Sequence, residues 1–187
     1  MSGGSACQVL NVRTSTSEDL YRILDIYNQG IEDRIATLET EAKDFDYMVN
    51  WFREHQNRYT VLVAESDGIV VGWASLNRYS HRCAYDGVAD LSIYVDRTFR
   101  SKGVGSALHA ELEKEARKSN FYKIVLFTFP FNENGQRLYR KMGYRKVGIF
   151  EKQGVINGQY VDVMIMKKLI KTIWIAGPVQ KVLLSFL

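Results

Sequence analysis

An arginine and two glycines form a motif that could bind an anion. Arg100, Gly103 and Gly105 are spaced Arg-x-x-Gly-x-Gly, between a β-rich run and a long amphipathic segment. Glycine lets backbone amides approach a ligand closely, and the first turn of a helix offers unpaired N–H groups with a partial positive charge. The segment therefore predicts a pyrophosphate cradle. Its residues are Arg100, Ser101, Lys102, Gly103, Val104, Gly105 and Ser106.

A short glycine motif can also be no more than the start of a helix. The spacing Gly-x-x-x-x-Gly-Lys-Ser/Thr of a Walker site is absent, and no Gly-x-Gly-x-x-Gly follows the first expected strand, as a dinucleotide fold would require. The strand before the motif, the amphipathic helix after it and the basic residues within it favour ligand binding over the purely structural interpretation.

The elements that must position this motif follow from hydrophobic periodicity. Strands are predicted over 9–13, 59–65, 69–76, 88–95, 123–129, 144–150 and 159–167. Helices are predicted after a Ser17 N-cap and over about 45–56, 103–118 and 132–142. This order predicts an α/β fold with a central mixed sheet and helices on both faces, in which 88–95, 103–118 and 123–129 form a parallel crossover unit.

The bulk composition sets the class of protein. With 187 residues, 46% of them hydrophobic, the chain suits one globular domain. We expect a flexible N-terminus over 1–8, the domain over 9–169 and a C-terminal tail of unknown role over 170–187. The net charge of +4 is scattered rather than clustered, which argues against nucleic-acid binding.

Cysteine usage and hydropathy bear on the compartment. Cys7 and Cys83 lack disulfide spacing and are interpreted as reduced thiols of a cytoplasmic protein, although a bond between them stays open. The three histidines show no zinc spacing, so no metal is expected. The N-terminus has no signal-peptide pattern, and the apolar stretches of the tail are too short and interrupted to span a bilayer.

These residues resemble the GNAT superfamily of acyltransferases, whose acyl-CoA motif is Arg/Gln-x-x-Gly-x-Gly/Ala. More narrowly, about residues 9 to 169 are similar to the phosphinothricin and methionine sulfoximine N-acetyltransferase group. The stretches that carry this similarity are Ile26-Tyr27-Asn28-Gln29-Gly30-Ile31, Thr37-Leu38-Glu39-Thr40, Arg82-Cys83-Ala84-Tyr85-Asp86, Ala89-Asp90-Leu91-Ser92-Ile93-Tyr94-Val95, Asn132, Leu138-Tyr139 and Gly143-Tyr144.

The resemblance implies acetyl-CoA as cosubstrate and a GNAT-like fold. It implies that the strand backbone at Ile93, Tyr94 and Val95 holds the pantetheine arm and the acetyl carbonyl, and that Asn132 hydrogen-bonds the pantetheine. It also implies a homodimer. Most relatives carry glutamate where this sequence has Asp90, and that carboxylate is the general base. The shorter Asp90 keeps the carboxylate but favours a bridging water.

The chemistry of acetyl transfer gives two side chains a role. An alkyl ammonium has a pKa near ~10, so at neutral pH a base such as Asp90, or a water that it orders, must accept a proton. Tyr139 could donate a proton to the departing sulfur. The alternatives are that Asp90 is a strand carboxylate paired with Arg82, that Tyr139 is a core residue, and that Asn132 only caps its helix.

Arg78, Arg82 and Tyr85 flank the strand that carries Asp90. Guanidinium groups bind carboxylate and phosphinate groups bidentately, so these residues predict an anionic amino-acid substrate whose α-amine is acetylated. A solvated surface cluster is the structural alternative. The functional alternatives are an acetyltransferase of a protein N-terminus or a polyamine, and a non-catalytic acyl-CoA binding module.

Overall fold

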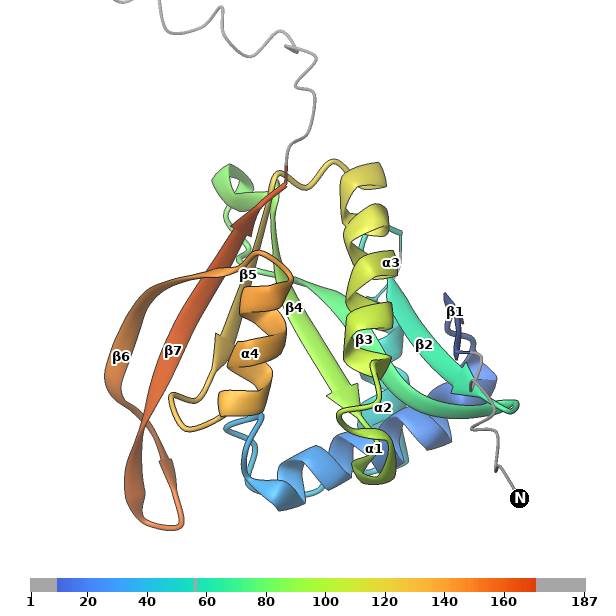
Figure 1. Cartoon of the computed structure of the whole chain (residues 1–187), viewed down its shortest axis with the longest axis horizontal. Coiled ribbons are helices and arrows are strands. Elements are labelled where there is room, and N and C mark those ends of the chain that lie inside the picture. The colour runs from blue at the N-terminus through green and yellow to red at the C-terminus, as the bar shows by residue number, and fades with distance from the viewer. Residues whose placement is uncertain (1–9, 56, 171–187) are drawn as a thin grey trace, which may run out of the picture.

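The computed structural model describes residues 10–55 and 57–170, and they form a single seven-stranded sheet. The strand order is β1-β2-β3-β4-β5-β7-β6, as Figure 1 shows. The strands are β1 (Leu10–Thr14), β2 (Val61–Ser66), β3 (Ile69–Arg78), β4 (Val88–Val95), β5 (Lys123–Thr128), β6 (Arg145–Ile156) and β7 (Gln159–Leu169). All neighbours are antiparallel except β4 and β5, which are parallel.

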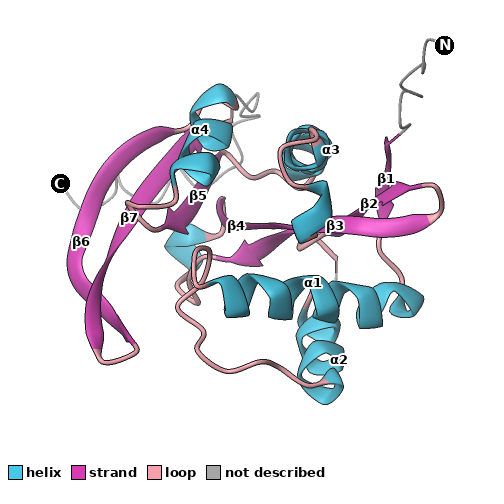
Figure 2. Ribbon diagram, turned by 60° about the horizontal axis from the view of Figure 1, so that its bottom comes forward, coloured by secondary structure: helices cyan, strands magenta, loops and turns pink. Residues whose placement is uncertain are grey.

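The helices cover both faces of the sheet, which confirms the predicted mixed α/β architecture (Figure 2). On one face lie α1 (Leu20–Asp33) and α2 (Phe45–Glu54), and on the other lie α3 (Val104–Lys118) and α4 (Glu133–Lys141). Apolar residues of α1 and α2 pack on one face of the sheet and those of α3 pack on the other, which gives the two larger buried clusters. A third, smaller cluster joins Phe129, Ile156 and Val163. The crossover β4–α3–β5 is the predicted parallel unit.

The start of the first helix differs from the prediction. A 3-10 turn (Ser17–Asp19) precedes α1, and the residue that caps this turn is Thr16 rather than Ser17. The backbone N–H of Thr16 donates to the Asp19 carboxylate at 2.7 Å. Asp19 is in turn held by the Arg13 guanidinium, 2.8 Å away, so a contact with β1 decides where the turn begins.

Two tight turns form where the sequence predicts them. Asp67 and Gly68 join β2 to β3 with φ values of 53° and 77°, and Asn157 and Gly158 join β6 to β7 with φ values of 52° and 76°. Asn, Asp and Gly tolerate these left-handed conformations best, so both dipeptides favour hairpins. The second hairpin is longer than predicted, because β6 runs from Arg145 to Ile156.

The two strands of the parallel pair separate soon after they meet. Residues 88–90 of β4 pair with 123–125 of β5, and the pairing ends there. Beyond it, β5 stays paired with β7 as far as Thr128, whereas β4 stays paired with β3 as far as Val95. Figure 1 shows the two strands diverging toward the end where α1 crosses the sheet. This divergence leaves one backbone edge of each strand without a strand partner.

A charged network ties the loop after β4 to α1. Asp96 accepts hydrogen bonds from Arg22 at 2.6 Å, from Gln29 at 3.1 Å and from the Thr98 hydroxyl at 2.6 Å. Burial disfavours ionisation of Asp96, but these donors outweigh burial and hold its pKa well below the usual range. Arg97 adds contacts with Glu32 and Asp33. The segment that leads into α3 is thereby fixed against α1.

We expect Asp96→Ala to lower the free energy of unfolding by about 1.5–3 kcal/mol, because it removes charged hydrogen bonds from a carboxylate that is only 5% exposed. Urea unfolding at neutral pH measures this loss. The matched control is Glu111→Gln, which removes an exposed helix ion pair with Lys114 and should cost less than about 0.5 kcal/mol. Equal effects of the two substitutions would contradict the anchoring role of Asp96.

Candidate active site

A cavity of about 740 Å³ opens where β4 and β5 separate. Its walls come from β4, from the end of β5, from α4 and the start of α3, and from the loop after α1. Asp90, Tyr94, Gly103, Asn132 and Tyr139 all line it. The structure thus brings the predicted cradle, the predicted base and the predicted proton donor to one cavity.

The glycine cradle sits at the start of α3. Gly103 is the N-cap of this helix with φ of 87°, and a Cβ added there would meet no atom within 4 Å. A Cβ on Gly105 would lie 2.9 Å from the Leu138 side chain. Gly103 therefore leaves open space in front of the helix N-terminus, and Gly105 lets α3 approach α4. This space and the free N–H groups suit a pyrophosphate.

The other residues of the predicted cradle divide into two groups. Ser101 and Ser106 line the cavity. Val104 is 1% exposed and belongs to the core beneath α3, while the Lys102 ammonium lies 5.0 Å from the centre of the Phe99 ring. Neither Val104 nor Lys102 is among the cavity-lining residues. A role for Lys102 in binding the pyrophosphate stays a prediction.

Arg100 has a structural task that its motif position does not reveal. Its guanidinium forms an ion pair with Asp33 of α1 at 2.5 Å and donates from Nε to the Val95 carbonyl at 3.2 Å. The side chain lines the cavity. It therefore contributes positive charge to the site from a fixed position rather than as a mobile arm.

The backbone of β4 offers hydrogen-bonding groups toward the gap. The N–H of Asp96 donates to Val71 on the β3 side. Because backbone groups alternate sides along a strand, the N–H groups of Ile93 and Val95 point the other way, toward β5. Since β5 pairs with β4 only as far as Asp90, these groups can receive a ligand's carbonyl and amide atoms. Side chains of Ile93 and Tyr94 complete this wall.

Asp90 is the titratable group with the chemistry of a base in this cavity. It is the last β4 residue that pairs with β5. Burial raises its pKa to about 7, although hydrogen bonds from the Leu91 N–H and the Asn77 side chain lower it somewhat. The Leu91 N–H lies 3.0 Å from one carboxylate oxygen. A carboxyl group with a pKa near neutrality can accept and release a proton at physiological pH.

Tyr139 and Asn132 reach the cavity from either end of α4. Burial and the charge of Asp90 raise the pKa of Tyr139 to about 12, so its phenol keeps its proton. Asn132 caps α4 by accepting from the Gly135 N–H at 3.0 Å, and its amide donates to the Thr128 hydroxyl at 3.2 Å. The capping role is confirmed, and a contact between Asn132 and a ligand stays a prediction.

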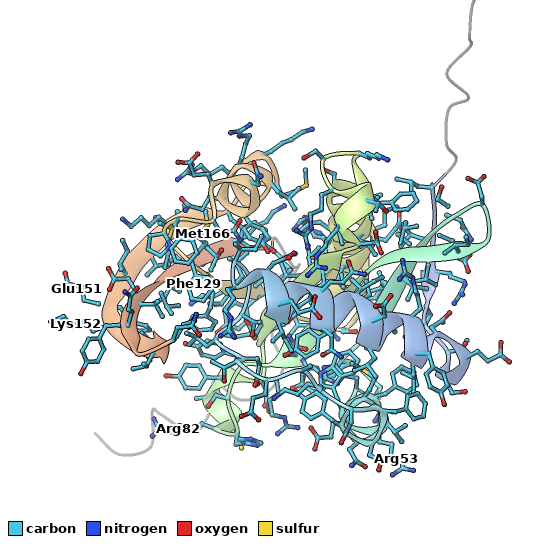
Figure 3. The ribbon with its side chains drawn as sticks, turned by 90° about the horizontal axis from the view of Figure 1, so that it is seen from below. Arg53, Arg82, Phe129, Glu151, Lys152 and Met166 are labelled. Carbon is cyan, nitrogen blue, oxygen red and sulfur yellow. The ribbon has the colours of Figure 1, made fainter. Side chains whose placement is uncertain are left out.

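The predicted acceptor-binding residues do not line the cavity within this chain. Arg78 is paired with Ala89, one position out of step with Asp90, so its side chain lies on the opposite face of the sheet, 5.6 Å from the Tyr59 ring centre. Tyr85 is 39% exposed and packs edge-on against Tyr79. Figure 3 shows Arg82 at the periphery, away from Phe129. A substrate contact of these three residues stays a prediction.

Several cavity residues have no counterpart in the motif analysis. Arg137 and Lys141 of α4 add two cations on successive turns, a spacing that the helix prediction could have revealed. Aromatic and apolar side chains also line the cavity. Ile35, Phe127, Phe129 and Val163 have no counterpart in the motif analysis, whereas Tyr27 and Leu38 belong to the stretches that carry the family resemblance.

Two other functional features are absent from the part of the chain that the structure describes. Across 10–55 and 57–170, no cluster of three or more His, Cys, Asp or Glu residues is arranged to hold a metal ion. No helix in the same ranges has the length and apolar character needed to cross a membrane. Cys83 is an exposed free thiol, while Cys7, the expected N-terminal segment and the expected tail beyond Ile170 lie outside the described residues.

Comparison with known proteins bears on the family of the chain. Residues 19–144 match the model of the Acetyltransferase (GNAT) family. The Bacillus subtilis protein YwnH, provisionally named a phosphinothricin acetyltransferase, is 31% identical over 158 residues, which are 84% of this chain and 97% of YwnH.

Two solved structures share the fold. A GNAT superfamily phosphinothricin acetyltransferase from Sinorhizobium meliloti in complex with AcCoA is 26% identical, with a TM-score of 0.82 over 86% of this chain and 88% of that chain. A ribosomal-protein-alanine N-acetyltransferase from Brucella melitensis is 30% identical, with a TM-score of 0.82 over 86% of this chain and 99% of that chain.

The pKa of Asp90 predicts a pH-dependent effect on stability. An unfolded aspartate ionises near 3.8, whereas folded Asp90 ionises near 7. Between these values the folded state binds more protons, so the wild-type stability should fall as pH rises. We expect Asp90→Asn to remove this loss, so the variant should gain stability over wild type between about pH 4 and pH 8. Urea unfolding across this range tests it.

Asp86→Asn serves as the control, because Asp86 is exposed on the same segment. Its stability difference from wild type should stay small at every pH. A constant difference between Asp90→Asn and wild type across the range would contradict a raised Asp90 pKa.

Proposed function

The chain belongs to the GNAT acetyltransferase family, and from this premise we propose that it transfers an acetyl group from acetyl-CoA to the α-amine of a small amino-acid-like substrate. Asp90 acts as the general base. The observation that carries the proposal is the position of Asp90. Its half-buried carboxyl group, with a pKa of about 7, lies where β4 and β5 separate, in the cavity that also holds the glycine cradle.

The cavity fits acetyl-CoA by several features. Open space lies in front of Gly103 at the α3 N-terminus, as a diphosphate requires. Arg137 and Lys141 add positive charge along α4. The unpaired backbone edge of β4 suits the amide groups of a pantetheine arm. When bound, acetyl-CoA supplies an activated acetyl group as a thioester.

The proposed catalytic residues have protonation states that suit their roles. Asp90, ionised, accepts a proton from the acceptor amine directly or through one water. The amine nitrogen then has a free electron pair for attack on the carbonyl carbon, and the C–S bond breaks as the new C–N bond forms. The second proton, which the nitrogen loses as it becomes an amide, replaces the one that Tyr139 gives to the sulfur. An N–H of the β4 edge at Ile93 or Val95 polarises the carbonyl oxygen. Tyr139, protonated because its pKa is about 12, can donate a proton to the leaving sulfur.

The acceptor class is supported by the relatives. YwnH and the Sinorhizobium structure carry phosphinothricin acetyltransferase names, and phosphinothricin and methionine sulfoximine both offer an α-amine. A second candidate acceptor is a protein N-terminus, which the name of the Brucella structure favours. A polyamine acceptor and a non-catalytic acyl-CoA binding module are further alternatives that the experiments below separate.

We also propose that the protein works as a cytoplasmic homodimer. The β6–β7 hairpin exposes apolar side chains on both of its faces near one edge of the sheet. Phe150, Val155 and Tyr160 are 45%, 53% and 70% exposed. Apolar side chains gathered on an edge strand favour contact with a second chain. Cell fractionation and sedimentation velocity at micromolar concentration test the two parts of this proposal.

Gly103→Val should weaken acetyl-CoA binding by roughly tenfold or more, because its side chain would occupy the space in front of the helix N-terminus and displace charge-assisted contacts. Isothermal titration calorimetry measures the affinity. Gly68→Val is the matched control: Gly68 also has a positive φ and no atom near its added Cβ, but it lies in the β2–β3 turn. Both variants should lose stability, and only Gly103→Val should lose affinity.

Acetyl transfer to a panel of acceptors tests the proposed reaction itself. Wild-type protein should acetylate methionine sulfoximine or phosphinothricin in preference to spermidine or an N-terminal alanine peptide. Asp90→Asn should lower kcat by roughly 10²–10⁴-fold, the range for one general base, and leave acetyl-CoA affinity near wild type. Free thiol release measures the rate.

The outcomes separate the alternatives. Turnover with spermidine or the peptide alone would contradict the amino-acid acceptor. Binding of acetyl-CoA without turnover on any acceptor would indicate a binding module. A loss of rate below about tenfold in Asp90→Asn would contradict its role as the base.

A further inference from the structure

Residues 34–44 join α1 to α2 and supply one wall of the cavity. Four of them line it: Ile35, Ala36, Thr37 and Leu38. The two helices lie on the opposite side of the sheet from α3 (Figure 2). Asp90 projects onto their side, because its side chain alternates in step with that of Tyr94, which packs against the buried cluster of α1 and α2. The segment that joins the two helices therefore borders the side from which an acceptor would reach Asp90.

The end of this segment is clamped to α1 by Asn28. The Asn28 amide nitrogen donates to the Lys43 carbonyl oxygen at 2.9 Å, and its amide oxygen accepts from the Lys43 N–H at 2.8 Å. A backbone N–H can only donate and a carbonyl oxygen can only accept, so this pair fixes the orientation of the Asn28 amide. Lys43 directly precedes Asp44, the N-cap of α2. The clamp therefore sets where the segment ends and α2 begins.

The middle of the segment rests on β6 at Gly154. A Cβ added to Gly154 would lie 2.6 Å from the Leu38 Cδ2 atom, which is closer than real side-chain atoms approach. Gly154 is not among the residues with a positive φ, so its missing side chain matters for space rather than for backbone conformation. Leu38 lines the cavity and Gly154 does not. Gly154 therefore acts on the cavity through the position of Leu38.

The start of the segment is also fixed. Asp33, the last residue of α1, pairs with Arg97 at 2.8 Å and with Arg100 at 2.5 Å. The segment is thus attached at both ends and in the middle, while Ile35 and Leu38 stay 38% and 41% exposed. Apolar side chains held at a cavity surface gain free energy when a ligand covers them.

We propose that Asn28 and Gly154 are positioning residues for the acceptor: together they hold residues 35–38 in place as the wall on which the acceptor packs. This rests on the proposed function, in which the acceptor delivers its amine to Asp90. A wall that is already held does not have to be ordered when the acceptor binds, so binding avoids that cost. A released wall is in place only part of the time, and the apparent affinity falls by that fraction.

The two positioning residues act apart from the glycine cradle. Neither Asn28 nor Gly154 lines the cavity. The cradle belongs to the start of α3, which packs on the other face of the sheet. Releasing the wall should therefore weaken binding of the acceptor and leave binding of acetyl-CoA unchanged. This split separates a positioning role from a general loss of structure, which would weaken both.

Two substitutions with matched controls test the proposal. Asn28→Ala removes both hydrogen bonds to Lys43, and its control is Asn50→Ala, at an exposed asparagine of α2. Gly154→Ala adds a Cβ that displaces Leu38, and its control is Gly148→Ala, on the same strand with no atom within 4 Å of the added Cβ.

Three quantities are measured for each variant. They are kcat and KM for methionine sulfoximine or phosphinothricin, whichever the wild type acetylates faster, the Kd of acetyl-CoA by calorimetry, and the hydrogen-exchange rate of the Lys43 amide by NMR.

We expect Asn28→Ala to raise the acceptor KM by roughly three- to thirtyfold, since two hydrogen bonds that hold the wall are lost. Gly154→Ala should raise it by roughly two- to tenfold. In both variants kcat at saturating acceptor and the Kd of acetyl-CoA should stay within about twofold of wild type. The Lys43 amide should exchange faster in Asn28→Ala alone, and the two controls should change none of these quantities.

A double-substitution cycle tests whether Gly154 acts through Leu38. In a Leu38→Ala background, Gly154→Ala should have no further effect on the acceptor KM, because the Leu38 methyl group that the added Cβ would displace is gone.

Three results would overturn the proposal. One is a wild-type acceptor KM in folded Asn28→Ala, and another is an equal loss of affinity for acceptor and acetyl-CoA. The third is an effect of Gly154→Ala that persists in the Leu38→Ala background. If Asn28→Ala does not fold, the Gly154 cycle decides alone. Failure of the proposed function is distinct, because the wild type would then acetylate neither amino acid, whereas failure of this inference leaves wild-type turnover intact.

Discussion

The separation of β4 from β5 is the constraint on which the site depends. Pairing between them ends at Asp90 because each strand follows a different neighbour. β5 is paired with β7 along all six of its residues, and β4 stays paired with β3 to Val95. Neither strand can turn back to the other without breaking those ladders. Buried backbone N–H and C=O groups need hydrogen-bond partners. An extended ligand can supply those partners along the open edge.

The electrostatics of the cavity come from fixed groups. Arg100 is tied to Asp33, and Asp96 gathers donors from α1. These contacts hold the segment before α3, so the N-terminus of α3 stays directed at the cavity. Preorganised dipoles and charges interact strongly with a ligand because no reorganisation is required on binding. Asp96 thus anchors the segment from outside the cavity, whereas Arg100 both anchors the segment and lines the cavity.

Residues of β4 have different roles because side chains alternate faces along a strand. Its backbone edge faces the gap, while Asp90, Ser92 and Tyr94 project onto the α1–α2 face and Leu91 projects into the core beneath α3. One strand thereby supplies the hydrogen-bonding edge, the proposed base and part of the core. A shift of register by one residue would exchange Asp90 with a core side chain, so the ladder with β3 protects the chemistry of the site.

Local sequence determined much of this protein. Strand β4 has the predicted bounds, and the Asp67-Gly68 and Asn157-Gly158 turns form because left-handed φ values are a local property of those residues. The conformation of Gly103 is also local, since it needs only the helix that this residue caps, whereas Gly105 is explained by the packing of α3 against α4. Asp90 and Tyr139 were identified through the resemblance of their stretches to a known family, and the structure places both in the cavity.

Contacts between distant segments required the tertiary structure. Thr16 replaces Ser17 as the cap because Arg13 holds Asp19. Arg78 lies on the opposite face from Asp90 because the β3–β4 register places it beside Ala89. The local sequence does not indicate that these two side chains occupy opposite faces of the sheet. His55 reaches Asn77 across 22 residues only because α2 packs over the sheet. Side-chain direction and long-range pairing depend on register and packing, which are decided when all the elements assemble.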